Sequence, residues 1–428
     1  MSRAIQFFLL FLAFIPSLFS NIIHVSDTAS LKQVGREIGP GDTVRLAEGR
    51  FLLSETIRWR NNGTKDQPIL IEGAGIGKTI IIAPLRKTAL EILGSHYHLR
   101  NLTMRGGSNT LSLAGNGLQV SFLEVSKGDK GIVLSGDTCK ISKVWIHDCP
   151  YTGIEVNGGY KYLPEVSVNP IRIRVAVREN TYPAHTAYLS GLMESRNMND
   201  TIEYAFIDRC GYRGKAINGG GIKAIPFVSG LYIYRSYARD IWFSAFWIDT
   251  PSKGLNEIVE CFAENARHGV HIELADSGDV NVVKNCVFYE VEQGIFNSSS
   301  QSSVFQNNHI YALKYGIINH GIKDNRVGRG LKGNYINNSI FLANTGKAHV
   351  IWYTGVEDRN SSRVENEYQV LPHQTVTIGY ADGYSYGDIR DGLESGRIFA
   401  GEKILLVASK PRFEIPDWDI PGLKESKN

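Results

Sequence analysis

The sequence predicts an all-β fold, a single-stranded parallel β-helix in which short strands wind into a stack of coils. Similar five-residue segments begin at residues 221, 245, 269, 294 and 316, so successive starts lie 24, 24, 25 and 22 residues apart. Most segments are preceded by a second strand-like run, and glycine or asparagine turns separate the runs. A unit of this kind cannot bury its own apolar face, whereas stacked units can.

Two other repeat folds fit less well. Leucine-rich repeats share the period, but this chain lacks their leucine and asparagine consensus. A propeller needs blades of about 40 residues. The 428 residues would otherwise suggest two or three domains, and one long solenoid uses the whole length.

Composition and charge argue against several classes of protein. The 46 Lys and Arg residues against 43 Asp and Glu leave a net charge of +3, so no strong field favours nucleic acid or an anionic membrane. Five cysteines are too few for a disulfide scaffold, and their odd number leaves at least one unpaired within the chain. We expect no nucleic-acid partner, no membrane insertion and a monomer with capped coil edges.

The N-terminus predicts export followed by a capped solenoid. Residues 1–20 have a positive start at Arg3, an apolar run over 7–15 and a small residue, Ser20, which is typical of a secretory signal peptide. The mature protein is then secreted, to the extracellular space or the periplasm. Asp27 can cap a short helix whose apolar face would cover the first coil.

The period divides the remaining chain into a solenoid and a tail. The β-helix is expected over residues 21–345, with a long excursion at about 159–205 where proline, charge and an Asn-Asp turn interrupt the repeat. Beyond about residue 345 the repeat fades, so residues 346–428 are expected to form an irregular tail that packs on the helix.

Strand alternation sorts the repeated positions into columns. The positions expected to point inward are Ile222, Phe246, Val270, Ile295 and Ile317, followed by Ala224, Ile248, Ile272, Asn297 and Asn319, the two asparagines as an amide ladder. The positions expected to point outward are Lys223, Trp247, His271, Phe296 and Ile318, with Ile225, Asp249, Glu273, Ser298 and His320 beside them.

Two acidic residues in the outward columns are candidates for chemistry. Neighbouring coils lie about 4.8 Å apart, so Asp249 and Glu273 should lie side by side. Two carboxylates at so short a distance repel each other, so either the pKa of one of them rises or the pair binds a cation. They could form half a calcium site, or the acid and nucleophile of a retaining glycosidase. The alternative without function is a solvated acidic edge.

The neighbouring column suggests sugar binding and elimination. An exposed Trp247 between Lys223 and His271 would cover the apolar face of a pyranose, although it could instead pack under the excursion or the tail. β-Elimination on a uronic acid needs a group that neutralises the carboxylate, a base for the C5 proton and an acid for the leaving oxygen. Lys223 or calcium could neutralise, and His271 or a lysine of lowered pKa could be the base.

Two segments near the N-terminus resemble a known superfamily. Residues 41–51 (GDTVRLAEGRF) and 67–73 (QPILIEG) are similar to the opening of secreted right-handed β-helix proteins of the pectate-lyase-like superfamily. The resemblance is most specific to chondroitinase B and the alginate lyases of polysaccharide lyase family six, and it covers roughly residues 22–345. That scaffold hosts lyases, hydrolases, esterases, epimerases and proteins without activity.

The resemblance implies roles for particular residues. Residues 250–253 (TPSK) look like the segment that bears the family's catalytic lysine, which implies that Lys253 is the base. The Arg-His-Gly at 267–269 matches the segment that supplies the family's arginine, so Arg267 is implied as a catalytic or substrate-binding group. The family carries arginine at the position of Lys223, and its motif does not include the pair Asp249 and Glu273.

The leading hypothesis is a secreted enzyme that cleaves a uronic-acid-containing polysaccharide by β-elimination. Its catalytic candidates are Lys223, Lys253, Arg267, His271, Glu273 and Asp249; Trp247 and Arg267 are the substrate-binding candidates, and Asp249 with Glu273 would hold calcium. A glycoside hydrolase or uronate epimerase, and a carbohydrate-binding or adhesive β-helix without activity, are the alternatives.

Overall fold

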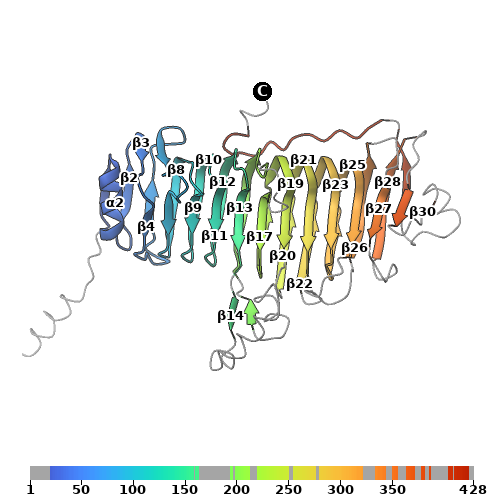
Figure 1. The fold of residues 1–428 in the computed structure, drawn as a ribbon, viewed down its shortest axis with the longest axis horizontal. Coiled ribbons are helices and arrows are strands. Elements are labelled where there is room, and N and C mark those ends of the chain that lie inside the picture. Colours follow the sequence, from blue (N-terminus) through green and yellow to red (C-terminus); the bar gives the residue numbers. More distant parts are fainter. Residues whose placement is uncertain are drawn as a thin grey trace, which may run out of the picture.

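The structure is a computed structural model in which short parallel strands stack into one long solenoid (Figure 1). It describes residues 20–158, 160–162, 193–195, 198–212, 219–249, 254–275, 279–321, 333–343, 349–354, 363–371, 377–380, 385–386, 403–407 and 409–423. The predicted signal peptide lies outside these residues apart from Ser20. Within them, no helix is long and apolar enough to cross a membrane.

Each coil contributes strands to three faces. The first face is formed by β1 (Ile22–Val25), β2 (Thr43–Leu46), β5 (Ile69–Glu72), β8 (Tyr97–Arg105), β10 (Gln119–Ser126), β12 (Lys140–His147), β16 (Thr201–Asp208), β18 (Tyr232–Tyr234), β20 (Gly254–Val259), β22 (Asp279–Lys284), β24 (Ser303–Gln306), β26 (Gly333–Leu342) and β28 (Arg363–Val370). Several of these strands turn the corner and continue onto the second face.

The third face carries the candidate site. It is formed by β4 (Ile57–Trp59), β7 (Leu90–Ile92), β9 (Asn109–Leu113), β11 (Lys130–Leu134), β13 (Thr152–Asn157), β17 (Gly220–Ile225), β19 (Tyr237–Asp249), β21 (Phe262–Glu273), β23 (Val287–Ser298), β25 (His309–His320), β27 (His349–Thr354) and β29 (Thr377–Tyr380). The second face begins with β3 (Gly49–Leu52) and β6 (Thr79–Ile82) and ends with β31 (Lys403–Leu406). The first halves of β19, β21, β23 and β25 lie on this second face, so these long strands run across the corner onto the third.

The predicted capping helix is present as α2 (Thr28–Glu37), at the blue end of the stack in Figure 1. The Asp27 carboxylate accepts a hydrogen bond from the Ser30 main-chain N–H at 2.9 Å, which satisfies one of the free donors of the first turn. Leu31 and Val34 are buried on the face that covers the coil. Gly35 lies against Trp59 so closely that a Cβ atom there would be 1.9 Å from the indole ring.

The interior confirms the predicted inward columns. The apolar members of both columns are at most 1% exposed. Asn297 and Asn319 are fully buried, and the Asn297 amide donates to Asn319 Oδ1 at 3.4 Å, so the predicted amide ladder exists. Tyr335 hydroxyl also bonds to both asparagines, which satisfies further polar atoms of the core.

A second asparagine ladder occupies a buried turn. The Asn308 main-chain N–H and side-chain amide both donate to Asn338 Oδ1, at 3.0 and 2.8 Å. The Asn338 amide in turn donates to the Phe305 carbonyl and to Asn366 Oδ1, each at 2.9 Å. Because buried polar groups need partners, each asparagine depends on the one in the next coil.

Two segment boundaries differ from those expected. Within the excursion, β14 (Tyr160–Tyr162) and β15 (Met193–Ser195) pair antiparallel to each other, but the solenoid resumes at Thr201 with β16. The parallel ladder also continues past residue 345, because β27, β28, β29 and β31 each pair with a preceding coil. β30 (Ser385–Tyr386) is antiparallel to β29.

The C-terminal residues 409–423 lie along the second face, where the brown trace of Figure 1 runs back over the stack. Phe413 contacts Tyr289 and His309, with ring centroids 5.8 and 6.0 Å apart. Further toward the terminus, Ile420 and Leu423 pack with buried aromatic residues of earlier coils. This segment therefore covers apolar surface on a face other than that of the candidate site.

The five cysteines are all free and buried. Their thiols face main-chain carbonyls, as for Cys261 with Val259 O at 3.4 Å and Cys286 with Lys284 O at 3.4 Å. Coil stacking and buried hydrogen bonds hold the described coils together with no disulfide in that part of the chain.

We predict that Asn338→Ala destabilises the solenoid by at least about 3 kcal/mol, since each orphaned buried polar group costs about 1–3 kcal/mol. The variant removes the Oδ1 acceptor of two Asn308 hydrogen bonds and the amide that donates to the Phe305 carbonyl and to Asn366 Oδ1, although Asn308 keeps its bond to Val283 O and Asn366 keeps the main-chain N–H of residue 338. Asn334→Ala, on the same strand but half-exposed, is the control. Chemical unfolding of both variants measures the difference, and equal stability would contradict the ladder's role.

Candidate functional site

The outward columns of the third face lie as the alternation predicts. Lys223, Trp247 and His271 are in register on β17, β19 and β21, and Phe296 and Ile318 continue the row on β23 and β25. Asp249 pairs with Glu273 in the next column. The structure thus brings Lys223, Trp247, His271, Asp249 and Glu273 together on three successive coils.

The expected exposure of Trp247 is wrong, because this side chain is 2% exposed. The Lys223 ammonium lies over one part of the indole, with Nζ 3.4 Å from the ring centroid. The His271 ring stacks on it at 4.8 Å, and Phe243 approaches at 5.2 Å. Trp247 is therefore the packed centre of the cluster, and its role as a sugar platform stays a prediction that this arrangement does not favour.

Lys223 is a buried cation held between aromatic and acidic groups. Its Nζ atom lies 3.5 Å from Asp249 Oδ2, and the side chain is almost completely buried. Burial lowers the pKa of Lys223, and the nearby carboxylates of Asp249 and Glu273 partly oppose that change. An ammonium in such surroundings releases its proton more readily than an ordinary lysine does.

His271 and His268 share one serine hydroxyl. Ser244 Oγ lies 2.9 Å from His268 Nδ1 and 3.5 Å from His271 Nδ1, and all three side chains are buried. Because the hydroxyl has a single proton, it can donate to only one of the two rings. If the Ser244 hydroxyl donates to His268 Nδ1, its oxygen can accept a hydrogen bond from the Nδ1–H of His271. In that tautomer the Nε2 atom of His271 carries a lone pair.

The His271 Nε2 atom faces the acidic column. It has no hydrogen-bond partner among the described residues, and it lies 3.8 Å from Glu273 Oε2. Burial lowers the pKa of His271 well below its ordinary value, and the positive charges of Lys223 and Arg267 add to this. The ring is therefore neutral at neutral pH, with a lone pair on one nitrogen, and it is a weaker base than an ordinary histidine.

Asp249 and Glu273 are the members of the set that reach solvent, with side chains 24% and 19% exposed. The Lys223 ammonium supplies a positive charge beside Asp249. No group of three or more His, Cys, Asp or Glu that could hold a metal ion occurs in the described part of the chain. Since calcium takes six to eight oxygen ligands, these two carboxylates alone do not make its site, and calcium binding stays a prediction.

Arg267 lies at the edge of the site and Lys253 outside the described residues. The Arg267 side chain is exposed on β21, with its guanidinium carbon 5.2 Å from the centroid of the Phe243 ring. Phe243 itself touches Trp247, so Arg267 borders the aromatic cluster. The role implied for Lys253 stays a prediction.

Sequence reasoning missed three residues that shape this site: Phe243, Ser244 and His268. Phe243 stands where β19 turns from the second face to the third, and its ring contacts both His268 and His271. His268 stacks on Phe296 at 4.8 Å. The Arg-His-Gly segment at 267–269 was a signal for His268, whereas Phe243 and Ser244 stand at the register shift between β19 and β21, which simple alternation does not predict.

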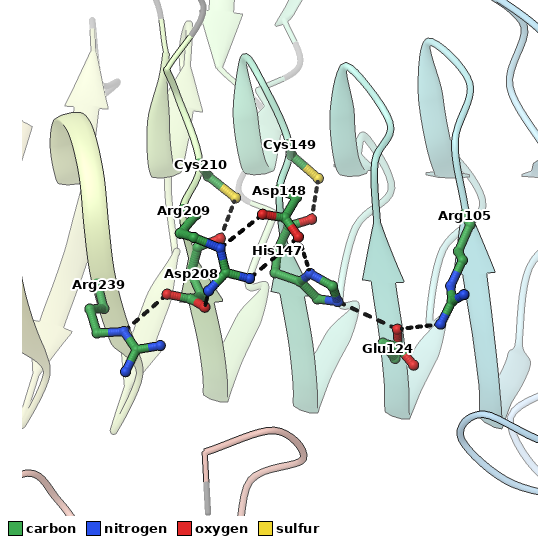
Figure 2. A network of polar contacts seen from close by, with 9 residues as sticks. All are labelled: Arg105, Glu124, His147, Asp148, Cys149, Asp208, Arg209, Cys210 and Arg239. Carbon is green, nitrogen blue, oxygen red and sulfur yellow. Dashed lines mark hydrogen bonds and ion pairs between the residues drawn. The ribbon is translucent and has the colours of Figure 1, made fainter. Parts of the chain in front are cut away.

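A second polar row lies on the second face (Figure 2). There His147 bridges two acids, with Nδ1 2.7 Å from Asp148 Oδ2 and Nε2 3.4 Å from Glu124 Oε1. The row continues through Asp208, which pairs with Arg209 and, at 3.0 Å, with Arg239. Every charge in Figure 2 has an opposite neighbour, so we interpret this row as a structural ion-pair network.

Glu124 shows how completely the charges of that row are compensated. Glu124 accepts hydrogen bonds from Thr103 at 2.9 Å and Arg105 at 3.0 Å. These partners and His147 together overcome its burial and lower the pKa of Glu124 to about 2. The third-face set differs, because His271 keeps an unpartnered nitrogen beside part-exposed carboxylates.

Comparison with known proteins supports the fold. A family model described as a right handed beta helix region matches residues 130–310. No curated protein matches the chain. A mannuronic acid specific polysaccharide family 6 lyase from human gut microbiota is 11% identical over 95% of this chain and 93% of its own, with a TM-score of 0.52.

Two further solved structures extend the likeness. The PL6 family alginate lyase AlyGC is 13% identical over 92% of this chain and 52% of its own, with a TM-score of 0.55. The catalytic domain of a GH87 alpha-1,3-glucanase is 10% identical over 90% of this chain and 68% of its own, with a TM-score of 0.54. The chain has the right-handed parallel β-helix fold. The likeness to family-six lyases, predicted from the N-terminal motifs, is confirmed as a likeness of fold.

We predict that the buried histidines make the protein less stable in acid. Burial lowers the pKa of His268 to about 3. Below the ordinary histidine pKa of about 6.5 the unfolded chain takes up a proton that the native ring does not. Stability should therefore fall by about 1.4 kcal/mol per pH unit for this group as the pH drops from about 6.5 toward 3.

The matched variant is His268→Asn, which keeps a polar group near Ser244. Its melting temperature should fall less than that of the wild type between about pH 7 and pH 5, because one linked proton is removed. Thermal unfolding at the two pH values makes the comparison. An equal fall in both proteins would show that His268 is not buried as a neutral ring.

Proposed function

We propose that the protein is an exported enzyme that cleaves a uronic-acid-containing polysaccharide by β-elimination. The observation that carries this proposal is the row on the third face in which two buried nitrogen groups each stand behind a part-exposed carboxylate. Lys223 lies 3.5 Å from Asp249, and His271 lies 3.8 Å from Glu273. Strongly perturbed titratable groups of this kind cluster at functional sites.

The base side of the reaction is Glu273 with His271. The C5 proton of the sugar passes to Glu273, which reaches solvent, and His271 Nε2 behind it accepts the proton. The lowered pKa of His271 keeps the ring neutral at neutral pH, and because burial opposes its protonation the ring holds the proton only in passing, before the proton leaves to solvent through Glu273. The electron pair of the C5–H bond then forms the C4–C5 double bond and expels the C4 oxygen.

The acid side is Asp249 with Lys223. Burial lowers the pKa of Lys223, so its ammonium can give up a proton through Asp249 to the leaving oxygen. We assign neutralisation of the uronate carboxylate, which makes the C5 proton more acidic, to Arg267, because this side chain is exposed and borders the aromatic cluster through Phe243. Each proton removed at C5 is thus matched by one delivered to the leaving group.

The fold adds support of a general kind. Two of the structures with the same fold are named as family-six lyases, one of them specific for mannuronic acid. A third is named as an α-1,3-glucanase, so this scaffold serves both elimination and hydrolysis.

Hydrolysis is the second candidate, and the in-register pairing of Asp249 with Glu273 favours it. A retaining glycoside hydrolase uses two carboxyl groups roughly 5 Å apart, one as the acid and one as the nucleophile, and two carboxylates on adjacent coils could fill these roles. In a hydrolase, Lys223 and His271 would only shift the pKa values of the two carboxyl groups.

The test is incubation of residues 21–428 with alginate, pectate, chondroitin sulfate, dermatan sulfate and heparan sulfate, each with calcium and with a chelator. Elimination creates an unsaturated uronate, so ultraviolet absorbance should rise on at least one polymer. New reducing ends without absorbance would contradict elimination and support hydrolysis. Loss of the signal in the chelator samples would assign calcium a part in neutralising the uronate carboxylate, which Arg267 alone would then not fulfil.

We predict that Glu273→Gln, Asp249→Asn, Lys223→Met and His271→Gln each lower the elimination rate by about 10²–10⁴, the usual contribution of general acid–base catalysis. The matched control is Glu257→Gln. Glu257 has a side chain 24% exposed, like Asp249, and pairs with Lys284 at 2.8 Å across neighbouring coils of the first face. Its variant should keep full activity, and an equal loss there would show that the effect is structural.

A further inference from the structure

Among the tryptophans whose side chains the structure describes, the most exposed one stands at the corner beside the candidate site. Trp242 is 64% exposed, whereas Trp247 on the same strand is 2% exposed. It immediately precedes Phe243, at the shift in register where β19 turns from the second face to the third. A single exposed aromatic side chain is ordinary on a protein surface, so the neighbours of Trp242 decide whether it marks a binding site.

The neighbouring corners carry an aromatic ring and a cation. The Trp242 main-chain N–H donates to the Cys210 carbonyl at 3.2 Å, which places Trp242 beside the corner that bears Tyr212, itself 51% exposed. On the other side Ile241 pairs with Ala266 and Ser244 with His268, so Arg267 is the single residue of β21 opposite the two residues Trp242 and Phe243 of β19. Tyr212, Trp242 and Arg267 therefore follow one another along the helix axis.

This corner is continuous with the site. The Arg267 guanidinium lies 5.2 Å from the Phe243 ring centroid, and Phe243 lies 5.2 Å from Trp247. A chain that runs along the corner would thus pass the edge of the aromatic cluster. One and two coils further on, Glu292 of β23 and Lys314 of β25 pair with each other at 3.6 Å.

We propose that Tyr212, Trp242 and Arg267 form a binding subsite for an anionic polysaccharide, in which one pyranose ring stacks on Trp242 and the carboxylate of the adjoining sugar, the one to be cleaved, pairs with Arg267. The indole offers a flat apolar surface with an N–H at its edge, which suits a sugar ring. The guanidinium offers a planar fork of donors that suits a carboxylate. The subsite rests on the proposed function only for its substrate class, since binding does not require turnover.

The experiment measures binding apart from cleavage. Affinity electrophoresis of the full chain in gels that contain alginate, polygalacturonate or neutral dextran gives a dissociation constant for each polymer. The Lys223→Met background prevents digestion of the gel polymer. We expect Trp242→Ala to weaken binding to at least one acidic polymer about tenfold, which corresponds to about 1.4 kcal/mol, and Trp242→Phe to retain most of it.

The matched control is Phe122→Ala. Phe122 is 39% exposed, with Lys143 Nζ 5.2 Å from its ring centroid, so it is another surface aromatic next to a cation, on a different part of the helix. This variant should bind as the parent does. Arg267→Gln should weaken binding to the acidic polymer and reduce its salt dependence, and it should leave any retardation by dextran unchanged.

The outcomes separate the subsite from the proposed function. Unchanged affinity of Trp242→Ala for every acidic polymer, equal losses in Phe122→Ala, or equal binding of dextran and the acidic polymers would overturn the subsite. Binding that depends on Trp242 in a protein that produces neither absorbance nor reducing ends would support the subsite and overturn the enzyme.

Discussion

Parallel, in-register stacking of coils is the constraint on which the rest of the molecule depends. Main-chain hydrogen bonds join each strand to the equivalent strand of the next coil, so a residue's neighbours along the axis are set by register. Alternation then decides which side chains enter the core. Lys223, Trp247 and His271 belong to segments 24 residues apart in sequence, yet this constraint makes them direct neighbours.

In-register stacking also brings charged side chains of successive coils close together, and the two polar rows stabilise these charges in different ways. On the second face, Glu124, His147 and Asp208 each have opposite charges on adjacent coils, which offsets the cost of their burial. On the third face, aromatic rings pack against Lys223 and His271, their carboxylate neighbours are part-exposed, and burial lowers the pKa of both groups. Such an arrangement costs stability and leaves groups poised for proton transfer, which is why chemistry is assigned to the third face.

Much of this could be predicted from the sequence, and the failures have physical reasons. The repeat predicted the fold, the capping helix and the pairing of Asp249 with Glu273, since period and alternation report register directly. Burial of Trp247 could not be read from alternation, because an outward side chain can still be covered by its neighbours, here Lys223, His271 and Phe243. The exposed Trp242 was missed because the corner in β19 interrupts the alternation that identifies outward positions.

Sequence alone also placed the end of the solenoid too early. Residues 349–354 and 363–370 continue the ladder although their repeat is weak, because main-chain pairing to a preformed edge tolerates varied side chains. The antiparallel pair β14–β15 had no periodic signal, since it stands outside the coil.

The central claim is that the third-face row, with the corner at Trp242, is where a polysaccharide is bound and processed. The most direct measurement is a crystal structure of the Lys223→Met variant with an oligosaccharide of the acidic polymer that the wild type degrades. We expect a sugar ring at the edge of the row, within hydrogen-bond distance of Asp249 or Glu273, with its carboxylate on Arg267. An oligosaccharide bound on the first or second face, away from these residues, would contradict the account.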